Sequence, residues 1–310
     1  MNYFFKKNPI NKKTQFEYPL KIDKYNLSRV LFPDYKHRSY KYAIYKQGQK
    51  NFFAKIWTGD TKNFDYNSLI NEINVYKNFV KFKKKDPLFF KNQKIKIPEL
   101  EFYCIQEKFV VLLIEHIVNK NYKKNDSKIL SIYLNDVLFF LRNVTESFGK
   151  FSKLKPKSLK FITIIYIFFL AIILIKRPKL VFLLGRCLFC LLKYFIYLFQ
   201  EKNNFFVHRS LEGQNIILNK KNIYLIDFQL LVLSHPLLDI AQIIAFYPKI
   251  EFVDHILKIK YLNNYYSDLR SKKLLSLLTI YSCLVQLALT SSLSKERIKI
   301  IDYFLSTSEI

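Results

Sequence analysis

The chain has 310 residues, half of them hydrophobic and 17% aromatic, and its 51 Lys and Arg against 24 Asp and Glu give a formal net charge of +27. This apolar fraction excludes a disordered chain, and four cysteines in this length exclude a disulfide scaffold. Five glycines exclude a glycine-rich repeat and a GxGxxG loop, and the length predicts one large domain or two tightly packed ones.

The positive charge is scattered along the chain rather than gathered in one segment. Lys, Asn, Ile, Phe and Tyr are abundant throughout, a bias that an AT-rich genome produces without selection for a partner. We therefore expect no dedicated nucleic-acid surface. Attraction to an anionic membrane or to phosphorylated ligands fits the charge.

The first 20 residues contain no apolar core of signal-peptide length and no cleavage site. We therefore expect a cytoplasmic chain with reduced cysteines. Cys187 and Cys190 form a CxxC pair inside an apolar stretch, without a second pair or a nearby histidine. This setting predicts buried helical cysteines rather than a metal site.

The first predicted elements are a β-hairpin and a helix. Residues 1–38 are polar, basic and short of periodicity, whereas residues 39–57 contain two β-prone runs on either side of a turn at Gly48. A helix is predicted over residues 66–80, because apolar side chains recur there at helical spacing: Leu69, Ile73, Tyr76 and Val80.

Two more strands are predicted at 94–105 and 108–117, and after about residue 127 the pattern is helical except for a β-like patch near 205–226. This asymmetry predicts an α+β fold of two lobes. Residues 1–118 would form a small lobe with a mixed β-sheet, and residues 119–310 a larger, mainly helical lobe.

An apolar helical hairpin is predicted at residues 159–199. Residues 161–175 carry no charge, and a second apolar run follows a break at Pro178. The first run is shorter than the roughly 20 residues of a spanning helix, which argues against a true span. Two interpretations remain: a pair of buried core helices, or a peripheral membrane contact through residues 153–199, whose lysines suit an anionic leaflet.

The passage FFVHRSLEGQNIILNKKNIYLIDFQ, residues 205–229, carries the most informative spacing. His208, Arg209 and Ser210 precede Asn215 by a short loop, and Asp227 follows an apolar strand. Amide and carboxylate oxygens are hard ligands of the kind that Mg²⁺ prefers. Asn215 and Asp227 each offer an oxygen ligand of this kind.

This passage resembles the kinase catalytic loop H-R-D-x-x-x-x-N followed by the metal-binding Asp of D-F-G. Residues 234–244, SHPLLDIAQII, resemble the D-P-x-x-D-[LI]-A segment of aminoglycoside phosphotransferase-like enzymes, and IDFQ is closer to their I-D-[FW]-E than to D-F-G. Kinases of envelope sugars, of the lipopolysaccharide and Kdo type, share the general pattern. The resemblance spans residues 40–245 and implies a protein-kinase-like, two-lobed fold that binds ATP and Mg²⁺. It implies that Asn215 and Asp227 hold the metal.

The resemblance also implies roles for residues of the first lobe. Phe53-Ala54-Lys55-Ile56 resembles the V-A-I-K strand, so Lys55 would contact the α- and β-phosphates and Glu72 would pair with Lys55. Backbone groups near Glu115 and Ile117 would meet the adenine. In the second lobe, His208 would brace the catalytic loop, and Asp239 would support that loop or cap the next helix.

One position departs from the family pattern. Ser210 stands where these kinases have the catalytic Asp, which accepts or orients the proton of the substrate hydroxyl. Serine is no general base near neutral pH, and the loss of general-base help costs about 10²–10⁴ in rate. Glu212 is the candidate surrogate, although its position in these families faces the phosphates.

Three functions follow from these residues. The first is a phosphotransferase, impaired at Ser210, that transfers the γ-phosphate of ATP to a hydroxyl of a small molecule or of a cell-envelope saccharide or lipid. The second is a pseudokinase, a nucleotide-binding or scaffolding module without turnover. The third is a membrane-surface binding protein on a kinase-like fold. The four residues Lys55, Glu72, Asn215 and Asp227 together favour nucleotide binding, and the apolar hairpin favours an envelope acceptor at the inner face of the membrane.

Overall fold

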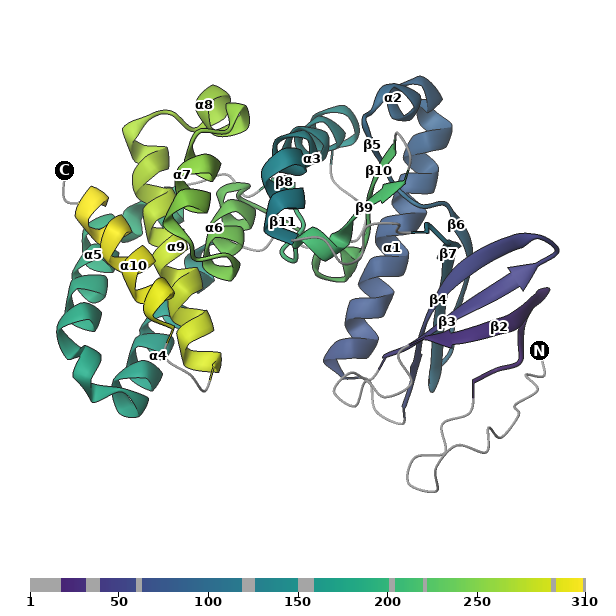
Figure 1. Cartoon of the computed structure of the whole chain (residues 1–310), viewed down its shortest axis with the longest axis horizontal. Helices are drawn as coiled ribbons and strands as arrows, with labels where there is room; N and C mark the ends of the chain where they lie inside the picture. Colours follow the sequence, from purple (N-terminus) through teal and green to yellow (C-terminus); the bar gives the residue numbers. More distant parts are fainter. Residues whose placement is uncertain are drawn as a thin grey trace. The chain divides into compact units, whose positions relative to one another are not determined.

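The computed structural model describes residues 18–31, 40–59, 63–118, 126–149, 159–200, 204–219, 222–290 and 294–308. The chain divides into two compact units (Figure 1). Unit 1 comprises Met1–Asn92, Lys96–Lys120 and Ile217–Gln229, and unit 2 comprises Gln93–Ile95, Asn121–Ile216 and Leu230–Ile310. Each unit is described by itself.

Unit 1 is built on a six-stranded sheet with the strand order β1-β2-β3-β4-β7-β6. Every strand pair in it is antiparallel, where the sequence predicted a mixed sheet. The reason is that short turns join β1 to β2, β3 to β4 and β6 to β7, and hairpin partners run antiparallel. The strands are β1 (Lys21–Ile22), β2 (Tyr25–Leu31), β3 (Tyr40–Gln47), β4 (Lys50–Thr58), β6 (Leu100–Ile105) and β7 (Phe109–Glu115).

The hairpin predicted around Gly48 is confirmed. β3 and β4 pair from Gln47 and Lys50 outward, and Gly48 adopts a φ of +58° in the two-residue turn. A positive φ is accessible to glycine without steric cost, which allows the tight connection. In contrast, β1 and β2 lie in a stretch for which the sequence predicted no strand.

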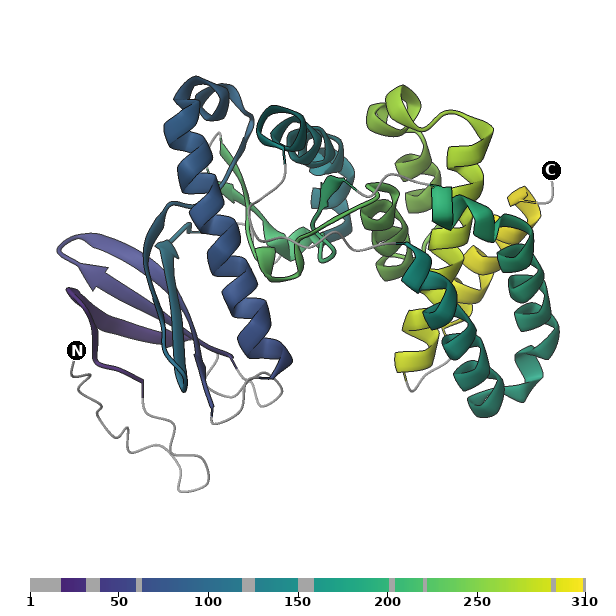
Figure 2. The same ribbon diagram turned by 180° about the vertical axis from the view of Figure 1, so that it is seen from behind.

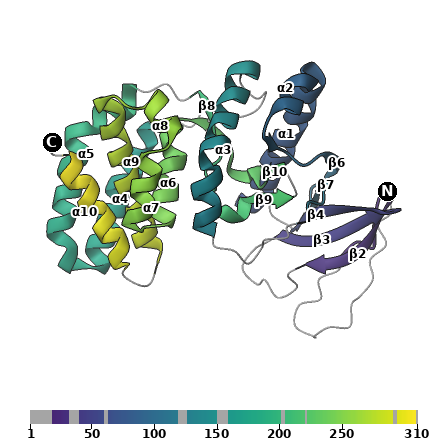
Figure 3. The ribbon, with the colours of Figure 1, turned by 45° about the horizontal axis from the view of Figure 1, so that its top comes forward.

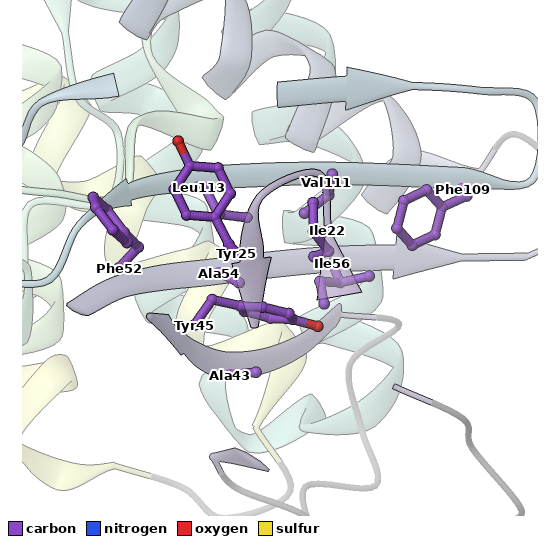
Figure 4. Packing of buried hydrophobic residues seen from close by; sticks show 10 residues of the cluster. All are labelled: Ile22, Tyr25, Ala43, Tyr45, Phe52, Ala54, Ile56, Phe109, Val111 and Leu113. Carbon is purple, nitrogen blue, oxygen red and sulfur yellow. The ribbon is translucent and has the colours of Figure 1, made fainter. Parts of the chain in front are cut away.

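Side chains on one face of this sheet form an apolar core (Figure 4). Successive side chains of a strand point to opposite faces, so Ala54 and Ile56 lie in this core while Lys55, between them, points to the other face. The members are Ile22, Tyr25, Ala43, Tyr45, Phe52, Ala54, Ile56, Phe109, Val111 and Leu113.

Helix α1 (Phe64–Lys85) contacts β4, β6 and β7 and runs along the sheet (Figure 2). Asn63 caps its first turn, where the side-chain oxygen accepts from Tyr66 N. Of the predicted apolar positions, Leu69, Ile73 and Tyr76 are buried and Val80 is half-buried. The helix therefore covers the face of the sheet to which Lys55 points. The shorter α2 (Pro87–Asn92) follows it.

The segment Ile217–Gln229 adds β-structure from far along the chain to unit 1. β9 (Ile216–Asn219) and β10 (Asn222–Leu225) are neighbours in a small sheet with the order β5-β10-β9, in which β5 is Ile95–Lys96. A short 3-10 turn, Phe228–Leu230, follows β10.

Unit 2 is helical, as the sequence predicted. Its helices pack mainly around α9, which contacts α4, α5, α6 and α10 (Figure 3). Two short strands, β8 (Phe205–Val207) and β11 (Val232–Ser234), pair within it. The helices are α3 (Asp126–Phe148), α4 (Lys160–Lys176), α5 (Val181–Gln200), α6 (Leu237–Phe246), α7 (Ile250–Leu257), α8 (Lys260–Tyr265), α9 (Leu269–Leu289) and α10 (Lys295–Ser308).

The predicted apolar hairpin is formed by α4 and α5, and a 3-10 turn at Pro178–Leu180 separates them. Two helical stretches among the described residues are long and apolar enough to cross a membrane: Pro178–Phe199, whose most apolar window is 28% buried, and Leu269–Leu289, whose window is 72% buried. The second is the core helix of unit 2. The first is mostly exposed, so α5 is not a buried core helix.

Candidate functional site

Three charged side chains of unit 1 converge on one point. Lys55 Nζ donates to Glu72 Oε2 and to Asp227 Oδ1, each at 2.8 Å. Lys55 and Glu72 are almost completely buried, while Asp227 keeps about a fifth of its side chain exposed. The buried lysine is thus held between two carboxylates, of which only Asp227 is partly open to solvent.

Three separate elements position this cluster. Side chains alternate between the two faces of strand β4, so that Lys55 points toward α1. Helical spacing places Glu72 on the same buried face of α1 as Leu69 and Ile73. Phe228 anchors the third element, because its backbone N–H donates to Glu72 Oε1 at 3.2 Å. The ring of Phe228 is fully buried and packs against Tyr76 and Phe79 of α1, with centroids 5.5 Å away in both cases.

Neighbouring carboxylates keep Lys55 charged. Burial disfavours the ammonium group of Lys55, but the charges of Asp227 and Glu72 outweigh it and raise the pKa of Lys55 above its ordinary value. Burial raises the pKa of Glu72, against the opposing effect of Lys55. The ring of Tyr40, 5.0 Å from Nζ, adds a cation–π contact.

Asp227 and Arg209 both adopt a left-handed backbone, with φ of +64° and +61°. Among the described residues, Asp23 is the only other non-glycine residue with positive φ. Such conformations cost about 1–3 kcal/mol each and persist where the surroundings impose them. Two of the three thus fall in the motif segment 205–229, which indicates that this segment is shaped for a task beyond packing.

The catalytic-loop-like segment of unit 2 is held by Asp239 of α6. Its two carboxylate oxygens accept from His208 N at 2.8 Å and Arg209 N at 2.7 Å. His208 and Asp239 are buried. Asp239 therefore supports the loop, one of the two roles that the sequence allowed for it.

Asn215 connects the two ends of this loop. Its Nδ2 donates to the carbonyl oxygen of Ser210 at 2.6 Å and to Ser210 Oγ at 3.3 Å. Because the amide nitrogen is used in this way, the side-chain oxygen Oδ1 is the atom available to a cation, which fits the predicted role. Glu212 is half-buried, and its carboxylate accepts from Gln214 Nε2 at 2.6 Å.

The residues predicted to meet the adenine lie at the end of β7 in unit 1. The backbone N–H of Glu115 donates to Glu99 O at 2.9 Å, and His116 N donates to Asn51 O at 3.3 Å. Ile117 is buried. Their contact with a nucleotide stays a prediction.

The structure brings together Lys55, Glu72 and Asp227 in unit 1, and it has the Lys55–Glu72 ion pair that the resemblance implied. It brings together Ser210 and Asn215 in unit 2. Asp227 and Asn215, the two predicted metal ligands, belong to different units. Each side chain by itself offers an oxygen of the kind that a hard cation such as Mg²⁺ prefers. No cluster of three or more His, Cys, Asp or Glu capable of holding a metal occurs in the part of the chain that the structure describes.

Sequence reasoning missed two polar residues of this cluster. Gln229 Oε1 accepts from Lys55 Nζ at 3.5 Å, and Gln229 Nε2 donates to Asp227 Oδ2 at 3.4 Å. Asn71 Nδ2 holds the backbone of this turn, donating to Gln229 O at 3.0 Å. Two signals in the sequence could have identified these residues. Asn71 directly precedes Glu72, and Gln229 stands at the last position of IDFQ, where the I-D-[FW]-E motif has Glu.

Asp239 makes a pH-dependent contribution to stability. Burial raises its pKa to about 6, although the N–H groups of His208 and Arg209 oppose that shift. A carboxyl group whose folded pKa is raised stabilises the fold below its unfolded pKa, about 3.9, and that stability is lost as the pH rises through 6. The full shift corresponds to about 3 kcal/mol.

We therefore expect Asp239→Asn, which removes this titration, to gain about 2–3 kcal/mol relative to wild type between pH 4 and pH 6.5. Urea unfolding of both proteins across this range measures the difference. A constant difference would show that Asp239 does not titrate there.

Comparison with known proteins identifies the fold. No family model and no curated protein sequence matches the chain. Several solved structures, in contrast, match the chain along most of its length. The aminoglycoside phosphotransferase APH(4)-Ia in complex with AMP-PNP and hygromycin B has a TM-score of 0.55 at 10% identity, covering 92% of this chain and 93% of its own. The spectinomycin phosphotransferase APH(9)-Ia has a TM-score of 0.51 at 12% identity, with the same coverage. Choline kinase from Cryptosporidium parvum Iowa II has a TM-score of 0.53 at 12% identity, covering 97% of this chain and 91% of its own.

Proposed function

Because the chain has the two-lobed, protein-kinase-like fold of the aminoglycoside phosphotransferases and choline kinase, we propose that it is an ATP-dependent phosphotransferase acting on a hydroxyl group. The observation that carries the proposal is the buried Lys55–Glu72 pair joined to Asp227. A packing module would gain little from such a cluster, since buried ion pairs contribute weakly to stability. A lysine fixed beside a partly exposed carboxylate suits phosphates and their metal.

Each of the site residues has a separate role in this proposal. Lys55 binds the α- and β-phosphates, and Glu72 orients Lys55. Asp227 and Asn215 would each supply an oxygen ligand to Mg²⁺, which would neutralise charge on the phosphates. Asp239 positions the loop through the backbone of His208 and Arg209. Backbone groups at Glu115 and Ile117 would contact the adenine.

The acceptor is a small molecule. The related structures contain hygromycin B or spectinomycin, and one is a choline kinase. For this chain we propose a hydroxyl of a cell-envelope saccharide or lipid, because the exposed apolar α4–α5 hairpin favours an acceptor near a membrane. The protein then works in the cytoplasm, at the inner face of that membrane.

Ser210 makes the chemical step slow. No carboxylate stands at this position, and Asn215 rather than an acid contacts Ser210 Oγ. Positioning and electrostatics still supply much of the catalysis in phosphoryl transfer. The second candidate, a pseudokinase that binds nucleotide without turnover, rests on this same serine.

Binding of Mg·ATP tests the proposal. Asp227→Asn keeps the shape of the side chain and leaves Lys55 paired with Glu72, so the fold of unit 1 is retained. We expect calorimetry to show binding by the wild type, lost on adding EDTA, and roughly 10- to 100-fold weaker binding by the variant because a metal ligand has lost its charge.

Asp65→Asn, on the same helix as Glu72 but outside the cluster, is the matched control and should bind as wild type does. An absence of binding by folded wild-type protein would refute both the phosphotransferase and the nucleotide-binding pseudokinase. Binding without ADP formation in the presence of any hydroxyl acceptor would favour the pseudokinase.

A further inference from the structure

The α4–α5 hairpin exposes an apolar surface that the proposed chemistry does not use. Of the 25 exposed large hydrophobic side chains among the described residues, 14 lie between Phe161 and Phe199. Those of α4 recur at helical spacing, on the side away from the buried residues Tyr166 and Leu170. A helix that is apolar on both sides is either enclosed or faces an apolar medium. The exposed large hydrophobic residues of α4 are Phe161, Ile164, Ile167, Phe168, Leu174 and Ile175.

The inner side of this hairpin is firmly part of unit 2. α4 and α5 both pack on α9, and α5 also contacts α10 (Figures 1 and 2). Tyr166 OH donates to Cys187 O at 3.1 Å, and Arg186 forms a 3.0 Å ion pair with Asp302 of α10. The exposed surface is therefore the outer side of a packed layer and not a loosely attached arm.

The end of the hairpin carries both exposed apolar side chains and basic side chains, the two features that bind a protein to an anionic membrane surface. Phe182 and Ile175, 87% and 82% exposed, have the highest exposed fractions of the large hydrophobic side chains that the structure describes. Between them lie Lys176, Arg177 and Lys179. We call these five residues the hairpin tip.

The hairpin tip is held in place by α9. Lys176 Nζ donates to Ala288 O at 3.1 Å, and Arg177 NH2 donates to Thr290 O at 3.0 Å. These bonds place the exposed Leu289 beside the tip. Leu289 is thus a third exposed apolar side chain at the basic hairpin tip, which these hydrogen bonds hold in place.

The charge of the hairpin is of one sign. Residues 159–199 contain no Asp or Glu and six basic residues. A twofold contact with a second copy would bring these basic residues together without an acidic partner from the hairpin, and such like-charge contacts are unfavourable. An anionic surface complements them. The six are Lys160, Lys176, Arg177, Lys179, Arg186 and Lys193.

The lengths and charges of the helices favour a position in the membrane plane. The 17 residues of α4 span about 26 Å at 1.5 Å per residue, less than the hydrocarbon core of about 30 Å. α5 is longer, but a span would place Arg186 and Lys193 in hydrocarbon. In the plane, Lys193 can extend toward the headgroups and Arg186 keeps its ion pair with Asp302, while the apolar residues enter the acyl boundary.

We propose that the outer surface of α4 and α5, led by the hairpin tip, docks this protein on the surface of an anionic phospholipid bilayer. The docking needs no nucleotide, so it stands apart from the proposed phosphotransferase activity.

Vesicle flotation of the full chain tests this. Wild type should float with phosphatidylcholine vesicles that contain phosphatidylglycerol, and high salt should weaken the binding because the Debye length falls from about 10 Å at 0.1 M to about 3 Å at 1 M. Ile175→Ser/Phe182→Ser should weaken partitioning about 100-fold, since two large apolar side chains are lost from the interface. Lys176→Gln/Lys179→Gln should weaken it about tenfold on anionic vesicles and leave the weak binding to pure phosphatidylcholine unchanged.

Phe64→Ser/Leu88→Ser is the matched control, because both residues are highly exposed but lie on α1 and α2. It should float as wild type does. Three results would overturn the proposal: equal flotation of the tip and control variants, resistance of the membrane-bound chain to alkaline carbonate, which marks a true span, or a dimer by light scattering that the tip variant abolishes while vesicle binding persists.

Discussion

Ser210→Asp is expected to raise the rate of ATP hydrolysis by this protein about 10²–10⁴-fold, the usual contribution of a general base. The loop that would carry the new carboxylate is already formed, because Asp239 holds the backbone of His208 and Arg209. Asn215 Nδ2 donates to the Ser210 carbonyl and lies 3.3 Å from Oγ, so it can also donate to an aspartate at this position. The substitution therefore adds a proton acceptor to an otherwise assembled loop.

The measurement is ADP release at saturating Mg·ATP, with water as the acceptor. Ser210→Asn has nearly the same shape without the charge and should show no gain. Adding Asp227→Asn to Ser210→Asp should remove the gain, because the metal ligand is lost. If Ser210→Asp stays at the wild-type rate while Mg·ATP binding is intact, the missing base is not what limits turnover.

Lys55→Met is expected to destabilise unit 1 by about 3–5 kcal/mol at neutral pH, since it leaves the buried Glu72 and the nearby Asp227 without their cation. Met retains the apolar stem, so lost packing contributes little. The single tryptophan, Trp57, is buried in β4 of the same unit, and its fluorescence in urea reports this transition.

The loss should depend on pH. Removing Lys55 removes the charge that opposes the burial-driven rise in the pKa of Glu72, so that pKa rises further. Stability associated with a raised carboxyl pKa is lost as pH rises. Lys55→Met should therefore be more destabilised at pH 8 than at pH 5.

Two further variants complete this test. Lys55→Met/Glu72→Gln should recover about 2 kcal/mol of the loss, because the buried charge has gone. Lys83→Met, which breaks the solvent-exposed pair with Glu99 in the same unit, should cost no more than about 1 kcal/mol. Equal losses for Lys55→Met and Lys83→Met would show that the buried cluster has no special stability.

Local patterns in the sequence predicted the elements that depend on near neighbours. The hairpin at Gly48, helix α1 and the α4–α5 hairpin all follow from side chains a few residues apart, through strand alternation, helical spacing and a proline break. Strand β1 was missed because two residues are too few to show a pattern, and β2 because its side chains are mostly half-buried or exposed without a clear alternation. β2 is stabilised by pairing with β3, and β1 by pairing with β2, which no local pattern reveals.

The resemblance of the sequence motifs to those of known kinases implied the kinase-like fold and the pairing of Lys55 and Glu72, and the sequence itself has Asn215 and Asp227 in one passage. Only the tertiary structure showed that Ile217–Gln229 returns to unit 1, where Phe228 packs on α1 and brings Asp227 to Lys55. It also showed which side of α4 and α5 is covered. The physical reason is the same in both cases, because packing of the whole unit decides both features and local spacing does not. Packing brings together residues more than 150 positions apart. It also selects which face is buried on helices that are apolar on more than one side.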